Sequence, residues 1–100
     1  MKYGMLDEEL LLMRDIFAQI PALERVVLYG SRAMGTNKPF SDIDITLVGN
    51  QLTNDDLTEV MFQLSESSLP YFCDVSLFHN LNNPALKDHI QRRGRTIFEA

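Results

Sequence analysis

The sequence has almost no cysteine, the residue whose disulfides stabilise many small domains. Cys73 is the only cysteine among 100 residues, and there is no tryptophan. One cysteine excludes a disulfide within the chain and any metal site built from a cysteine cluster. Cys73 stands in the apolar run "YFCDVSLF", so we expect a buried, unreactive thiol with no catalytic role.

Long hydrophobic runs and flexible linkers are also missing. No stretch approaches about 18 uninterrupted apolar residues, and the start of the chain lacks the apolar segment of a signal peptide. We therefore expect a cytoplasmic protein that makes no membrane contact. Hydrophobic residues make up 45% of the chain and charged residues 23%, which is typical of an ordinary globular protein.

The length predicts one domain over residues 1–100. A chain of this size can bury a core, but it has no room for a separate substrate-binding domain. If the protein is an enzyme, we expect another chain to supply part of the substrate site. A hetero-oligomer and a homodimer both remain open.

Positive charge is scarce as well. The formal net charge of −5 disfavours a protein that holds nucleic acid on its own surface. The one basic cluster, Arg92, Arg93 and Arg95, is typical of a solvated helix end whose cations favour the C-terminal dipole. A second interpretation makes the segment from Leu86 to Phe98 a docking patch for an acidic partner.

Hydrophobic periodicity and turn residues predict alternating helices and strands, hence an α/β (α+β) fold around a small sheet. Asp7 is the expected cap of the first helix, and Thr53 or Asn54 that of the second long helix, with Leu57, Val60, Met61 and Leu64 on one face. The expected elements are a helix over 6–20, a strand over 23–30, a helical turn over 31–35, a loop over 36–40, a strand over 41–49, a helix over 52–67, a strand over 70–78, a helix over 83–94, and a short strand or extended end over 95–100.

Three aspartates occur inside the predicted strands, where desolvating a charge is costly. Side chains alternate between the two faces of a strand, so Asp42 and Asp44 share the side opposite the apolar one, and Asp74 does the same in a later strand. If these strands are neighbours, the three carboxylates converge and repel each other. A hard divalent cation such as Mg²⁺ is the usual remedy, so the pattern predicts a metal site.

The Gly-Ser pair before the first aspartates predicts a phosphate cradle. Gly30 lets the backbone approach an anion closely, Ser31 offers a hydroxyl and an amide, and Arg32 could neutralise further charge. Taken alone, each motif is weak, because Gly-Ser pairs occur in turns and aspartates commonly cap strand ends. The combination is more specific. Neither a calcium-binding EF-hand loop nor a G-x-x-x-x-G-K-[ST] phosphate loop is present. His79 and His89 are each expected to be a surface or strand-end residue rather than a catalytic base.

The stretch "GSRAMGTNKPFSDIDITL" closely resembles the signature of the nucleotidyltransferase superfamily related to DNA polymerase β. That signature is G-S, a spacer, D-x-[DE] in a strand, and a third acidic residue in a following strand. The short length and the "GSRA-G" and "SDID" forms are similar to the minimal nucleotidyltransferase (MNT) group. Met34 departs from the pattern, because many relatives have arginine there.

The resemblance implies a polymerase β-like palm fold, in which helices flank a small mixed sheet. It implies that Gly30 and Ser31 bind nucleotide phosphates, that Asp42, Asp44 and Asp74 hold Mg²⁺, and that Asp74 also helps to deprotonate the attacking hydroxyl. The implied reaction transfers a nucleotidyl group to an acceptor hydroxyl, and the group expected is AMP from ATP.

Three hypotheses follow from this resemblance. The first is an active transferase that modifies a tyrosine of a helical HEPN-domain partner, as the antitoxin of a toxin–antitoxin pair. The second is a non-catalytic subunit that neutralises such a partner by contact. The third is a transferase for a small molecule, such as an antibiotic hydroxyl. Three converging carboxylates favour the first hypothesis over the second, and the missing second domain disfavours the third.

Overall fold

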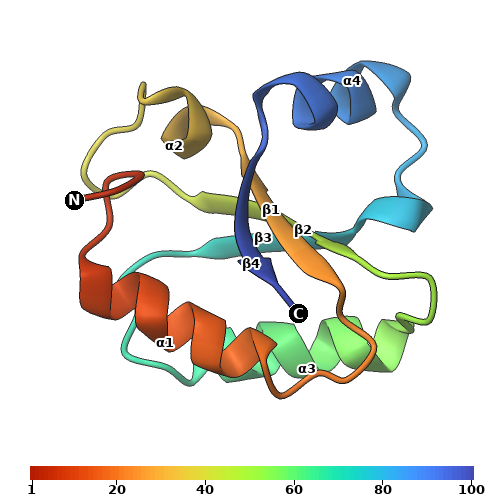
Figure 1. The fold of residues 1–100 in the computed structure, drawn as a ribbon. Helices are drawn as coiled ribbons and strands as arrows, with labels where there is room; N and C mark the ends of the chain where they lie inside the picture. The colour runs from red at the N-terminus through yellow and green to blue at the C-terminus, as the bar shows by residue number, and fades with distance from the viewer.

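A four-stranded mixed sheet forms the centre of the computed structural model, which describes residues 1–100 (Figure 1). The strand order is β3-β2-β1-β4. The elements along the chain are α1 (Asp7–Phe17), β1 (Arg25–Tyr29), α2 (Ser31–Met34), β2 (Ile43–Val48), α3 (Asn54–Ser65), β3 (Cys73–Leu77), the 3₁₀ helix η1 (Phe78–Asn80), α4 (Pro84–Arg93) and β4 (Arg95–Glu99).

The pairing within the sheet confirms the predicted mixed α/β architecture. Strand β1 runs antiparallel to both β2 and β4, whereas β2 and β3 run parallel. The final segment, for which a strand and an extended end were both open, pairs with β1 as a strand. Strands β2 and β3 are therefore neighbours, which is the condition for their aspartates to meet.

The two faces of the sheet are covered differently. Helices α1 and α3 lie together along one face, and α2 and α4 lie on the other side (Figure 1). The apolar side chains of the strands, such as Val26, Ile45 and Val75, are buried with residues of α1 and α3 in one core. The opposite face carries the aspartates of β2 and β3, as strand alternation requires.

The first helix differs from its prediction at both ends. Its N-cap is Leu6 and not Asp7, because the Leu6 N–H donates to the Glu9 carboxylate at 2.8 Å. The helix ends at Phe17, and the backbone continues to Ile20 through bonds between residues three apart. Ile20 lies in this turn and is buried in the core, so the apolar periodicity of the sequence continues beyond the end of the helix.

The second long helix follows its prediction more closely. Thr53 is the N-cap, and its hydroxyl accepts from the Asp56 N–H at 3.3 Å. Val60 and Leu64 are buried as expected, but the prediction for Met61 is wrong, since 46% of this residue is exposed. At α4, Asn83 caps the helix and Pro84 occupies the first turn, as the sequence indicates.

Candidate active site

The sheet register brings two of the predicted carboxylates side by side. Asp44 of β2 lies opposite Asp74 of β3 in the parallel pair, and opposite Tyr29 of β1 in the antiparallel pair. Asp42 comes just before β2 and is exposed, as is Asp74, while Asp44 is half-buried. The predicted convergence therefore centres on Asp44.

The electrostatics of Asp44 report this crowding. Its pKa is raised above the ordinary value, first because burial disfavours the charged carboxylate, and then because Asp74 and Asp42 repel it. The pKa of Tyr29 is also raised, chiefly by burial, with Asp74 and Asp44 adding to the effect. A positive charge placed among these groups would relieve the repulsion.

Gly30 lies directly beside Asp44. Its φ is 76°, and a Cβ at this position would stand 2.5 Å from the Asp44 carboxylate oxygen Oδ2. Only glycine satisfies both the backbone angle and the close approach. Ser31 then begins α2, whose first-turn amides have no acceptor within the helix. The Gly-Ser turn and the carboxylates thus form one continuous surface.

His89 is a member of this site that the sequence did not predict. The Gly30 N–H donates to His89 Nε2 at 3.2 Å, and the imidazole stands edge-on to the Tyr29 ring with centroids 6.3 Å apart. Because Nε2 accepts this bond, it carries no proton in this arrangement. His79 is exposed, whereas His89 is half-buried, and its contact with Gly30 is the feature that the sequence did not predict. No local pattern marks a contact across 59 positions.

The structure corrects the role predicted for Arg32, which is only 1% exposed. Its guanidinium donates to the carbonyl oxygens of Ser41 at 2.7 Å and Tyr3 at 3.0 Å, and it stacks 4.3 Å from the Tyr71 ring centroid. Further bonds reach the carbonyls of Gly4 and Pro39. Arg32 therefore anchors the loop between α2 and β2 to the N-terminal segment, and leaves no free donor for a phosphate.

The donor set suits a hard divalent cation, because carboxylate oxygens are the ligands such ions prefer. Asp42, Asp44 and Asp74 would hold the ion. However, no group of three or more His, Cys, Asp or Glu side chains is already gathered tightly enough to do so. The aspartates therefore need further oxygen ligands, of the kind a triphosphate carries, to complete a coordination shell.

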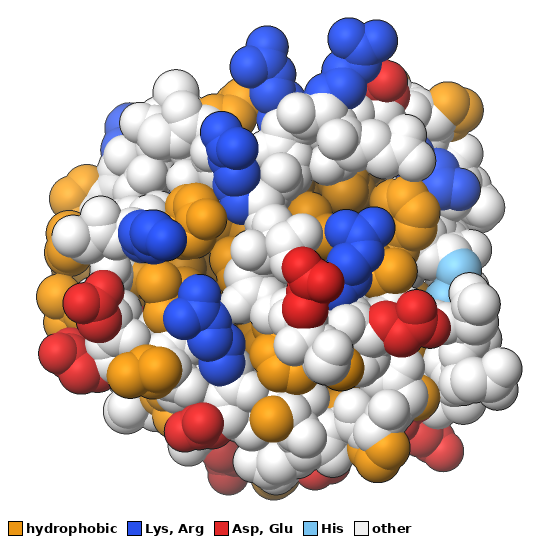
Figure 2. All heavy atoms as spheres, in the orientation of Figure 1, with side chains coloured by type: hydrophobic (Ala, Val, Ile, Leu, Met, Phe, Trp, Pro, Cys, Tyr) orange, Lys and Arg blue, Asp and Glu red, His pale blue; other side chains and the backbone are white.

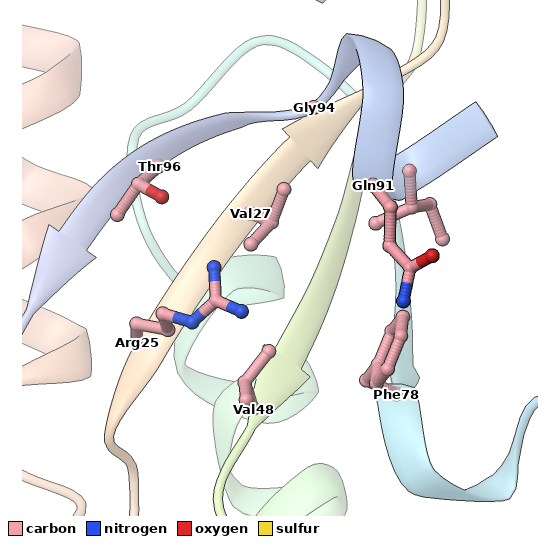
Figure 3. Close-up of a pocket in the computed structure, with 8 residues that line it drawn as sticks. Arg25, Val27, Val48, Phe78, Gln91, Gly94 and Thr96 are labelled. Atoms are coloured by element: carbon pink, nitrogen blue, oxygen red, sulfur yellow. The ribbon is translucent and has the colours of Figure 1, made fainter. Parts of the chain in front are cut away.

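Two other features lie outside this site. A cavity of about 290 Å³ lies between α4 and the sheet, where Arg25 extends between Val27 and Val48 and Gln91 extends toward Phe78 (Figure 3). It includes none of the predicted site residues. Burial raises the pKa of the Cys73 thiol to about 11, so the thiol stays protonated and unreactive, as expected.

Comparison with protein families decides the identity. The family model for the polymerase beta nucleotidyltransferase domain matches residues 13–100. The chain belongs to the polymerase β-like nucleotidyltransferase family. Members of this family use a divalent metal, so the aspartate chemistry and the family agree. A comparison with curated proteins gives no match.

Solved structures place this nucleotidyltransferase beside MNT proteins. It is 28% identical, with a TM-score of 0.70, to a chain of a toxin–antitoxin complex crystallised with AMP-PNP, covering 95% of this chain and 75% of that one. It is 27% identical, with a TM-score of 0.68, to a chain of a substituted MntA–HpeT toxin–antitoxin complex, covering 96% and 75%.

A third complex shares the fold. It contains a tri-AMPylated HEPN toxin and an MNT antitoxin from Shewanella oneidensis, and the match has 23% identity and a TM-score of 0.61, covering 94% of this chain and 69% of that one. The resemblance to the MNT group is thereby confirmed.

None of the helices of this nucleotidyltransferase is long and apolar enough to span a membrane.

Proposed function

We propose that this nucleotidyltransferase is Mg²⁺-dependent and transfers AMP from ATP to a tyrosine hydroxyl of a HEPN-domain partner, as the antitoxin of the pair. The observation that carries the proposal is the position of Asp44. It stands between Asp74, its register neighbour, and Gly30, whose missing side chain leaves room for its carboxylate. The carboxylates proposed to bind the metal and the turn proposed to bind the phosphates are therefore direct neighbours.

Each residue has a distinct task in this proposal. Gly30 lets the backbone approach the phosphates closely, the amide and the hydroxyl of Ser31 hold them, and Asp42, Asp44 and Asp74 hold the cation. The bound cation supplies positive charge that neutralises the phosphate oxygens. The acceptor hydroxyl oxygen forms a bond to the α-phosphorus, the bond to the β-phosphate oxygen breaks, and pyrophosphate leaves. Asp74, exposed at the edge, accepts the hydroxyl proton.

The nucleotide and the partner rest on the relatives. The complex at 28% identity was solved with AMP-PNP, an ATP analogue, which supports ATP as the donor. Its toxin–antitoxin assembly, and the tri-AMPylated HEPN toxin of the third complex, support a HEPN-domain acceptor.

Labelled transfer tests the proposal. The purified nucleotidyltransferase is incubated with a HEPN-domain protein encoded beside it, Mg²⁺ and ATP labelled at the α-phosphate, and the partner is analysed by mass spectrometry. We expect an AMP adduct on a partner tyrosine that is lost with Asp44→Asn. The matched control is Asp55→Asn, an exposed aspartate in the first turn of α3, which should transfer normally.

The two alternatives give different results in the same experiment. A contact-only subunit would bind and neutralise the partner with no label, and Asp44→Asn would neutralise it equally well. A small-molecule transferase would leave the protein unlabelled and label an added aminoglycoside-type hydroxyl compound. Either pattern would overturn the proposed acceptor.

A further inference from the structure

Charge is distributed unevenly over this acidic chain. Acidic residues gather in the first turns of α1 and α3, which cover one face of the sheet. Basic residues gather at the opposite side, in the last turn of α4 and the start of β4. In Figure 2, blue side chains stand out at the α4 side of the molecule, and further blue ones lie among red and hydrophobic ones at the left and centre of the view. The last turn of α4 and the start of β4 thus form a basic pole on a chain whose formal net charge is −5.

A hollow occupies this basic pole. It has a volume of about 460 Å³ and is lined from α4 and β4 by Arg92, Arg93 and Arg95, and from α2 by Met34. All three arginines are exposed. Arg92 donates to Asp88 at 2.9 Å, an exposed pair that a competing carboxylate can replace at little cost. The thioether side chain of Met34 is 49% exposed and adds an apolar contact.

The hollow adjoins the candidate active site. His89 lines it, and the same imidazole accepts the hydrogen bond from the Gly30 N–H at 3.2 Å. A molecule bound in the hollow therefore lies one side chain away from the Gly-Ser turn. An acceptor held there would lie beside His89, whose partner Gly30 adjoins the Asp44 carboxylate.

We infer that this hollow docks an acidic segment of the protein acceptor, with the arginines binding its carboxylates and Met34 an apolar side chain. The inference rests on the proposed function. Exposed arginines that reach into solvent, together with an apolar contact, suit a protein surface better than an enclosed small anion. A nucleic acid is disfavoured because the chain as a whole carries a formal charge of −5.

Charge reversal tests the docking hollow. The variant Arg93→Glu with Arg95→Glu is compared with the control Lys2→Glu with Arg25→Glu, which alters the net charge equally at exposed positions outside the hollow. Binding of the HEPN-domain protein is measured by interferometry at two salt concentrations, and binding of Mg²⁺ with ATP by calorimetry. We expect the dissociation constant for the HEPN-domain protein to rise at least about tenfold, with ATP binding and the control unchanged.

Other outcomes of these measurements would overturn the inference. Normal partner binding by the hollow variant, or a wild-type chain that does not bind the HEPN-domain protein, overturns the inference. So does a loss of ATP binding, which would make the arginines part of the nucleotide site. If the neutral variant Arg93→Gln with Arg95→Gln also weakens docking while unfolding normally, misfolding is excluded as the cause.

Docking and transfer fail separately. Partner binding that depends on the arginines, without any AMP adduct from the wild type, would keep the docking inference and overturn the proposed transfer. An AMP adduct formed equally well by the hollow variant would do the reverse.

Discussion

Among single residues, Gly30 carries two constraints at once. Its φ of 76° and ψ of −155° describe a backbone conformation that residues with a side chain avoid. A Cβ added at this position would also clash with the Asp44 carboxylate. Gly35 has the same φ of 76° but open space around it, with nothing within 4 Å of an added Cβ. The ψ of 16° places Gly35 in the milder left-handed helical region, so a side chain there meets a positive φ with less backbone strain than at Gly30 and without contact to a carboxylate.

We predict that Gly30→Ala abolishes AMP transfer, whereas Gly35→Ala retains it. Both should lose stability, by about 1–3 kcal/mol for a side chain forced to positive φ. Transfer assays and denaturant unfolding of the two variants check this. Equal activity in both would show that Asp44 does not need the space that Gly30 leaves.

We predict that the charged carboxylate of Asp44 is needed for transfer and lowers the stability of the fold. Burial and the charges of Asp74 and Asp42 raise its pKa in the fold above the unfolded value of 3.8. The folded state therefore binds the proton more tightly. The stabilisation from this residue is present below the unfolded pKa and is lost as pH rises through the folded pKa.

Asp44→Asn removes the charge that is repelled, so its melting temperature at pH 7 should equal or exceed that of the wild type while transfer disappears. Below the unfolded pKa the difference in stability should vanish. Thermal unfolding across pH 3–7 measures both, at pH values chosen around the unfolded pKa of 3.8. A large loss of stability at pH 7 would instead make Asp44 a structural hydrogen-bond acceptor.

Arg32 has the opposite profile, because its guanidinium is buried and bonded to carbonyls. We predict that Arg32→Ala destabilises the fold by roughly 2–4 kcal/mol, since it leaves buried carbonyl groups unpaired and opens a cavity. Arg32→Lys should rescue only part of this, because an ammonium lacks the planar fork. An unchanged unfolding midpoint for Arg32→Ala would contradict the anchoring role.

At the scale of whole elements, α4 is the helix that joins the active face to the basic pole. Ile90 is buried, His89 reaches Gly30, and the arginines of its last turn line the hollow. One helix thus contacts the turn proposed to bind phosphate and also carries arginines of the surface proposed to receive the acceptor.

We predict that His89→Ala lowers transfer about tenfold through a looser Gly-Ser turn, while stability changes by only about 0.5–1.5 kcal/mol, the value of one hydrogen bond. Gln91→Ala, an exposed position on the same helix, is the control and should leave transfer unchanged. Kinetics at saturating ATP check this. If both variants behave alike, the bond from Gly30 has no part in positioning.

These elements also show what the sequence could predict. The strands, the three aspartates and the Gly-Ser turn follow from local spacing, because alternation along β2 and β3 places the carboxylates opposite the apolar side of each strand. That β2 and β3 are neighbours, with Asp44 opposite Asp74, was a condition that only the structure supplies. The positions of His89 and Arg32 depend on contacts with segments 59 and 29 residues away, respectively, which local periodicity does not contain. Arg32 also follows the Gly-Ser pair, so its sequence position suggested a phosphate contact that burial rules out.

At the scale of the whole molecule, the proposed chemistry of this 100-residue chain lies on one face of a single four-stranded sheet. The carboxylates are close enough to repel but are not gathered into a complete metal site. We therefore expect the cation and the nucleotide to bind as a pair, each supplying ligands or charge that the other needs.

Calorimetry of ATP binding, with Mg²⁺ and with EDTA, tests whether the cation and the nucleotide bind as a pair. We expect ATP to bind well with Mg²⁺, its affinity to fall at least about tenfold with EDTA, and Asp44→Asn to remove the difference between the two conditions. Tight ATP binding that is indifferent to EDTA, in the wild type and in Asp44→Asn alike, would contradict it.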